Sequence, residues 1–197
     1  SNTGAWHHEN NSNPEGMKYE STTMGERITQ LYLDPLSASL IRTGLRRAVR
    51  RKVREIGPVT NFGLLHLATS TPDFTSLWAK NSEMDANSNL WLKTNSVEKE
   101  LLSDASYDEM LLGNVKSAWM VEMWANEDNI RSIEKELDVN PGDIHYRVDI
   151  MEWLIHASRE IILTDDVFSD EHMKDIAEIV KMLDILRLRV RLSLIHI

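Results

Sequence analysis

Apolar residues between Asn140 and Leu163 recur at helical spacing along two stripes, whereas a surface helix needs only one. At about 100° per residue, the core-facing stripe contains Ile144, Val148, Met151, Ile155 and Ile162. The second stripe lies on the other side of the helix and contains Tyr146, Ile150, Trp153 and Ala157. Asn140 and Asp143 are good capping residues around the turn dipeptide Pro141-Gly142, so we expect this helix to begin near Asp143.

The second stripe has two explanations. The helix could be central and packed on both sides, because all-round hydrophobicity usually means burial. Alternatively, Tyr146 and Trp153, which stand two turns apart, form a stacking platform for nucleobases. Bases bind aromatic faces with roughly 1–3 kcal/mol each. The pattern alone does not choose between these explanations.

Helical spacing also dominates the rest of the chain. It predicts helices at 25–33, 36–56, 60–70, 115–125, 129–137 and 169–191. We further expect a helix capped by Thr71-Pro72-Asp73 that carries Phe74, Leu77 and Trp78. Residues 80–95 are polar and predict a loop, residues 17–22 a short strand, and residues 1–16 a wing between strands. The fold class is therefore mainly α.

Composition narrows the class of protein. The 197 residues are 42% hydrophobic and 27% charged, which is ordinary for one or two globular domains. The absence of cysteine excludes disulfides and thiolate metal sites. No apolar run approaches the roughly 20 residues that span a bilayer, so we expect a cytoplasmic protein with no membrane partner. With 31 acidic and 22 basic residues, the chain does not coat nucleic acid by charge alone.

Few residues suggest chemistry. The outer side of the helix at 36–56 carries a basic cluster in which Arg46 and Arg50 are candidate phosphate contacts, although such a cluster is usually a solvated face. His66 lies among apolar residues, which is typical of a hydrogen-bonded core histidine. The sequence contains no Gly-rich phosphate loop, HExxH motif or nucleophile elbow. We therefore assign no catalytic residue, cofactor site or metal ligand.

Four segments along residues 17–191 resemble, in order and spacing, the C-terminal half of an archaeal superfamily-two DNA repair helicase. They are YESTTMGERITQLYLDPLSA at 19–38, FGLLHLATSTPD at 62–73, PGDIHYRVDIMEWL at 141–154 and LRLRVR at 186–191. The branch is the Ski-like one, the fork-remodelling Hel family. In that family a winged-helix domain is followed by a helical ratchet domain, in which one long helix lies along single-stranded DNA.

The resemblance implies that residues 143–163 form the ratchet helix. The family's two base-contacting positions, an arginine and a tryptophan seven residues apart, match Tyr146 and Trp153 here, so the tryptophan is kept and the arginine is not. We expect the nucleic-acid-binding surface to consist of Trp153, Tyr146, Arg147 and Ile150. Tyrosine can stack on a base but brings no guanidinium for phosphates or base edges.

The resemblance also divides the chain. We expect residues 1–34 to be the C-terminal part of a winged-helix domain with its wing, and residues 35–191 to be the helical ratchet domain. Residues 192–197, LSLIHI, depart from the family and resemble the translation of a sequencing-transposon end, so we expect a non-native tail. The fold is then a partial winged helix followed by a helical bundle.

The function implied is the single-stranded DNA-gripping portion of an ATP-dependent 3′ to 5′ helicase that acts in replication-fork repair. Its partners are single-stranded or forked DNA and the RecA-like motor domains of the same chain. ATP and Mg belong to those motor domains upstream, so this fragment holds no cofactor and is inactive alone. Two alternatives stay open: a helical protein-interaction module without a motor, and an RNA helicase of the same branch.

Overall fold

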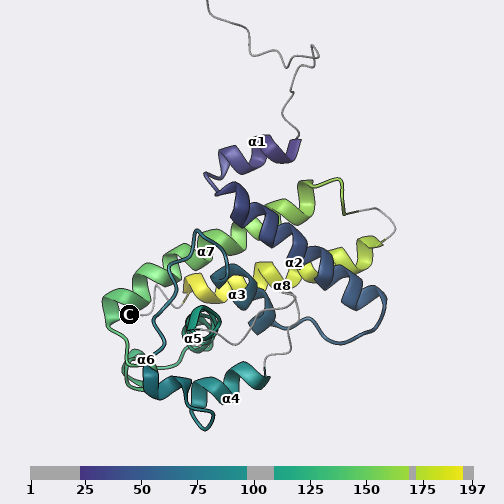
Figure 1. Cartoon of the computed structure of the whole chain (residues 1–197). Coiled ribbons are helices and arrows are strands. Elements are labelled where there is room, and N and C mark those ends of the chain that lie inside the picture. The colour runs from purple at the N-terminus through teal and green to yellow at the C-terminus, as the bar shows by residue number, and fades with distance from the viewer. Residues whose placement is uncertain (1–22, 97–108, 169–171, 193–197) are drawn as a thin grey trace, which may run out of the picture.

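The computed structural model describes residues 23–96, 109–168 and 172–192 (Figure 1). Within them the chain forms eight α-helices and one short 3₁₀-helix, η1, and no strand. The helices are α1 (Thr23–Gln30), α2 (Pro35–Val53), α3 (Asn61–Thr69), α4 (Asn89–Ser96), α5 (Glu109–Ala125), α6 (Ile130–Leu137), α7 (Pro141–Thr164) and α8 (Met173–Leu192), and η1 is Asn81–Met84. The mainly α fold is confirmed. The strand and wing expected at 1–22 lie outside the described residues, and so do residues 193–197.

Helix α7 is the central element. It packs against α8, α2, α3, α5 and α1, and Figure 1 shows it, in green, crossing behind α2 and alongside α8. All five residues of the predicted core stripe are buried. The helix begins at Pro141, two residues earlier than expected, with Asn140 at the cap position. Proline suits this place because its fixed φ is already helical and its missing N–H has no partner there anyway.

Helix α2 starts where Asp34 accepts a hydrogen bond from the backbone N–H of Leu36 at 2.7 Å. It ends at Val53, three residues earlier than expected, because Glu55 adopts a left-handed backbone conformation with φ 51°. The middle of α2 lies directly against α3. A Cβ atom at Gly44 would come within 2.4 Å of the Leu67 side chain, so glycine permits this close approach.

The prediction of a helix after Thr71-Pro72-Asp73 is wrong, because residues 73–80 form an irregular segment. Its backbone groups bond to neighbouring helices instead of to each other. Leu77 donates its N–H to Ser117 Oγ on α5 at 2.7 Å, and the Trp78 carbonyl accepts a bond from Lys116 Nζ at 3.2 Å. The ammonium of Lys116 is almost fully buried and also meets the Glu83 carboxylate at 2.8 Å. Tertiary partners therefore replace the helical ladder.

The loop expected at 80–95 is also wrong in part, because this stretch contains η1 and α4. The hydroxyl of Ser88 accepts a bond from the Trp91 N–H at 3.0 Å near the start of α4, and Leu90 is buried. The hydropathy pattern does not predict these helices, because most of their residues are polar and the apolar part of α4 is short.

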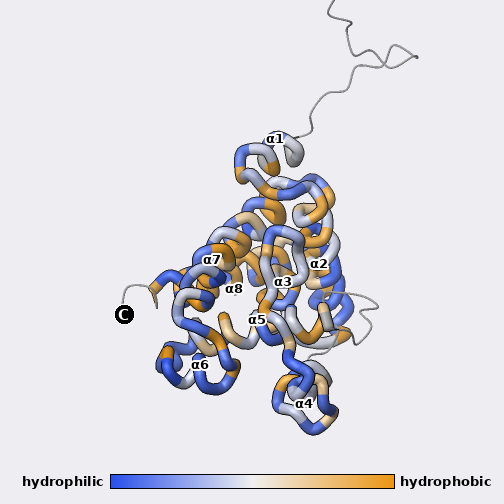
Figure 2. Tube along the Cα trace, turned by 60° about the vertical axis from the view of Figure 1, so that its left-hand side comes forward, coloured by the Kyte–Doolittle hydropathy of each residue, from blue (hydrophilic) through white to orange (hydrophobic). Residues whose placement is uncertain are grey.

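The remaining predicted helices are confirmed. Helix α5 is buried along most of its length, and α6 begins at the expected cap, Asn129. The indole of Trp124 on α5 donates to the Val190 carbonyl on α8 at 3.0 Å. Figure 2 shows the hydrophobic positions gathered where α2, α3, α5, α7 and α8 meet, with hydrophilic positions outside. No helix in the described ranges combines the length and hydropathy needed to cross a membrane.

His66 lies in the core on α3, as the sequence predicts, and burial lowers the pKa of its imidazole to about 4. Its Nε2 atom has no hydrogen-bond partner among the described residues, contrary to the expectation of a hydrogen-bonded histidine. The ring is therefore neutral at neutral pH, because a charged imidazole would lose its hydration without gaining a partner.

This burial predicts acid sensitivity. The unfolded chain takes up a proton on His66 near pH 6.5 and the folded chain only near pH 4. The contribution of neutral His66 to the free energy of unfolding is therefore complete above pH 6.5. It is lost as the pH falls toward 4, by about 3 kcal/mol in total. We expect urea titrations at several pH values to show that the free energy of unfolding falls less steeply with decreasing pH for His66→Leu than for the unmodified chain. Parallel curves for the two proteins would contradict this role.

Candidate nucleic-acid interface

The second stripe of α7 brings together three of the predicted site residues. Tyr146, Ile150 and Trp153 follow one face of the helix, and Tyr146 and Trp153 are about 10 Å apart along its axis at 1.5 Å per residue. The side chain of Tyr146 is 56% exposed. Ile150 and Trp153 are partly buried and pack against the core. An open aromatic ring is thus followed, two turns later, by a partly covered one.

Trp153 has a fixed orientation. Its indole Nε1–H donates to the backbone carbonyl of Leu31 at 3.2 Å, at the junction between α1 and α2. One turn further along α7, Ala157 is completely buried. The second stripe is therefore divided: its C-terminal half is covered, as the central-helix explanation expects, and its N-terminal half stays open at Tyr146. Each explanation describes one half of the stripe.

Arg147 lies elsewhere. Its side chain points into the protein and is only 8% exposed. The guanidinium donates to the Thr75 carbonyl at 2.8 Å and to the Asp143 carboxylate at 2.8 Å. The hydrogen bond from Arg147 lowers the pKa of Asp143. Because these bonds and the burial occupy the guanidinium, Arg147 attaches the 73–80 segment to α7 and does not face the exposed surface with Tyr146.

Arg46 and Arg50 are exposed on α2 and do not join the aromatic face. They line a separate hollow of about 230 Å³ together with Phe168 and His172 from the connection between α7 and α8. Nearby, Arg42 forms an ion pair with Asp165, which ties the middle of α2 to the end of α7. Asp165 is twelve residues beyond Trp153, or about 18 Å along the helix direction. The two arginines therefore lie well away from the ring of Trp153.

The polar side of α7 near Trp153 is held by α8. Arg187 donates to the Glu152 carboxylate at 2.6 Å and to Nδ1 of His156 at 3.2 Å. At the other end of the helix, the ring of His145 packs edge-on against Trp124 with centroids 5.3 Å apart. These contacts fix the rotation of α7 about its axis, and therefore the direction in which its aromatic face points.

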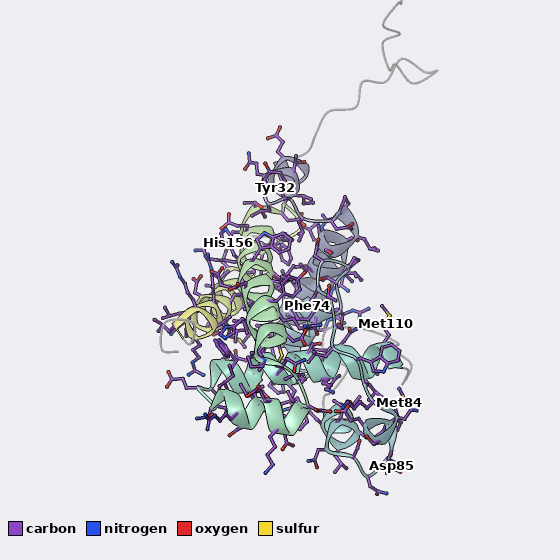
Figure 3. The ribbon with its side chains drawn as sticks, turned by 90° about the vertical axis from the view of Figure 1, so that its left-hand side faces the viewer. Tyr32, Phe74, Met84, Asp85, Met110 and His156 are labelled. Carbon is purple, nitrogen blue, oxygen red and sulfur yellow. The ribbon has the colours of Figure 1, made fainter. Side chains whose placement is uncertain are left out.

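The sequence did not reveal an apolar hollow of about 780 Å³ beside the 73–80 segment. Its lining includes Leu36, Phe74, Trp78 and Met110, of which Phe74 is buried and the other three are exposed. Figure 3 shows Phe74 beside the middle of α7 and Met110 farther out. The sequence signal for this hollow is the number of large apolar residues in a polar, proline-containing stretch, a pattern that also predicts a helix.

The known proteins that resemble this chain are helicases. The family model for archaeal helicase, domain 4, matches residues 62–191. ATP-dependent DNA helicase Hel308 of Methanocella arvoryzae is 36% identical over 75% of this chain, and the protein of the same name from Thermococcus kodakarensis is 28% identical over 88%. A third, from Caldivirga maquilingensis, is 29% identical over 76%. The chain spans about a fifth of the length of these curated relatives.

A substitution can distinguish the predicted role of Arg147 in binding nucleic acid from its structural role in holding the 73–80 segment. We expect Arg147→Met to lower the free energy of unfolding by about 1–3 kcal/mol, because the Thr75 carbonyl loses its charged donor. Arg46→Met is the matched control, since an exposed arginine is worth no more than about 0.5 kcal/mol. Denaturant titrations followed by circular dichroism provide the measurement. If Arg147→Met left stability unchanged but weakened binding to single-stranded DNA, Arg147 would belong to the interface after all.

Proposed function

Because the chain belongs to the archaeal helicase domain 4 family, we propose that it is the part of an ATP-dependent 3′ to 5′ DNA helicase that grips single-stranded DNA. The parent protein acts in replication-fork repair. The relatives carry the name of ATP-dependent DNA helicases, and this chain corresponds to about a fifth of their length. The gripping element is α7, which lies along the strand as a ratchet helix.

The observation that supports this proposal is the aromatic face of α7. Tyr146 offers an open ring, and Trp153 offers a ring whose edge is held by the Leu31 carbonyl. A ring held in one orientation loses little conformational freedom when a base stacks on it. Stacking at Trp153 then resists backward movement of the strand between steps of the motor.

The proposed grip depends more on stacking than on charge. The formal net charge is −9, and Arg147 and Arg187, which both contact α7 side chains, are paired with carboxylates. Arg46 and Arg50 remain candidate phosphate contacts at a distance from the rings. Few neutralised phosphates release few counterions, so the affinity should decrease only modestly with added salt.

The motor belongs to the rest of the parent protein. RecA-like domains of the same polypeptide bind ATP and Mg²⁺ and drive the strand past Trp153, while this chain alone performs no ATP hydrolysis. The apolar hollow beside Trp78 is a candidate contact for those domains, because exposed apolar patches usually mark interfaces. The same hollow is the observation that favours the second candidate function, a helical protein-interaction module without a motor.

DNA binding by the chain provides the direct test. We expect Tyr146→Leu and Trp153→Leu each to raise the Kd for a labelled oligodeoxythymidine by about 5- to 150-fold, the equivalent of one lost base stack. Leucine keeps apolar packing against the core while removing the aromatic face. Fluorescence anisotropy at two salt concentrations measures the Kd, and circular dichroism confirms the fold.

Leu92→Ala is the matched control, because Leu92 is an exposed apolar residue on α4, which packs against α5 and η1. Its Kd should equal that of the unmodified chain. Unchanged binding in both aromatic variants, with the fold intact, would refute DNA gripping by α7 and favour the protein-interaction module. Tighter binding to oligouridine than to oligodeoxythymidine would instead identify RNA as the substrate.

A further inference from the structure

Tyr32 is the most unusual aromatic residue in the described part of the chain. Its side chain is 90% exposed, although it stands between two apolar residues. Its backbone is left-handed, with φ 54°. The other non-glycine residues with positive φ in the described ranges are Glu55, Glu127 and Asp138, all of them acidic. A large ring is uncommon in this backbone region, and its presence requires a reason.

The capping of α1 explains why the backbone of Tyr32 is left-handed, but not why the residue there is a tyrosine. After α1, Leu33 donates its N–H to the Ile28 carbonyl and Tyr32 donates to the Thr29 carbonyl, each at 3.2 Å. This pair of bonds is the Schellman motif, in which the residue at the position of Tyr32 is usually glycine. Tyrosine is strained there, and its exposed ring returns almost no burial. The fold alone would therefore favour glycine.

The backbone on both sides of Tyr32 is firmly held. On one side, the Leu31 carbonyl accepts the indole N–H of Trp153. On the other, Leu33 is buried, and Asp34 donates its N–H to the Asp73 carboxylate at 2.9 Å. The ring of Tyr32 is thus presented to solvent by a rigid turn that is also bonded to the ratchet tryptophan.

We propose that Tyr32 is a third base-stacking residue on the DNA path, adjacent to Trp153. This inference rests on the proposed function of α7. Its chemistry is that of an uncharged, flat and exposed ring, which binds the face of any base and reads no sequence. Figure 3 shows Tyr32 above the end of α7 that carries His156. A strand that passes Tyr146 and then Trp153 therefore meets Tyr32 next, as it reaches the α1 end of the helix.

The position allows a test that separates binding from folding. Tyr32→Gly removes the ring and places the preferred residue in the Schellman motif. We expect its melting temperature to equal or exceed that of the unmodified chain, while its Kd for oligodeoxythymidine rises at least about fivefold. Tyr32→Phe retains the ring and should retain the Kd. Photocrosslinking to an oligonucleotide that carries 5-iododeoxyuridine should label the peptide containing Tyr32, and Tyr32→Gly should abolish that label.

The outcomes distinguish this inference from the proposed function. If Trp153→Leu weakens binding and Tyr32→Gly does not, the inference is wrong while DNA gripping by α7 stands. If the unmodified chain shows no binding to single-stranded DNA, both are wrong. A large loss of stability in Tyr32→Gly would also overturn the inference, because it would show that the ring serves the fold.

Discussion

The burial of α7 among α1, α2, α3, α5 and α8 is the constraint on which the other features depend. Five apolar residues along one side of the helix are removed from water, and each contributes roughly 1.5–3 kcal/mol. A helix held by so many neighbours cannot rotate or slide independently. The small part of its surface that remains open, around Tyr146, is therefore presented in one fixed direction. The proposed function of α7 requires such a fixed presentation.

Polar anchors complete this framework where apolar packing ends. Arg147 and Lys116 are both buried, and each binds a backbone carbonyl of the irregular 73–80 segment. A buried cation without partners would be very costly, so each is matched by a carboxylate, Asp143 or Glu83. These two side chains attach the irregular segment to α5 and α7. The apolar hollow beside Trp78 is lined by residues of this segment, Phe74 and Leu77 among them.

The candidate interface combines rings from different parts of the chain around a single hydrogen bond. The bond from Trp153 to the Leu31 carbonyl joins α7 to the turn after α1. It fixes the edge of one ring and the backbone that carries another, Tyr32. Under the proposed function, rings held in this way would need little reorganisation when a strand binds. This arrangement suits an acidic protein, because stacking requires no excess of positive charge.

Hydrophobic periodicity was enough to predict the strongly amphipathic helices, the buried stripe of α7 and its aromatic face. The spacing of Tyr146 and Trp153 follows directly from the 3.6-residue period, and the core stripe is a local property of the same helix. The family was also readable from ordered segments, because their spacing reflects the order of the elements. The expected wing and domain boundaries remain predictions, since residues 1–22 lie outside the described residues.

Contacts between distant parts of the chain settled which polar groups are hydrogen-bonded and which segments are irregular. Arg147 looked like a neighbour of the aromatic pair, but the direction of its side chain depends on the Thr75 carbonyl, 72 residues away. Residues 73–80 had the composition of a helix, yet α5 and α7 supplied better partners for their backbone groups. The exposure of Tyr32 depends on how α1 meets α7. Each of these outcomes comes from contacts between residues distant in sequence, which local periodicity does not encode.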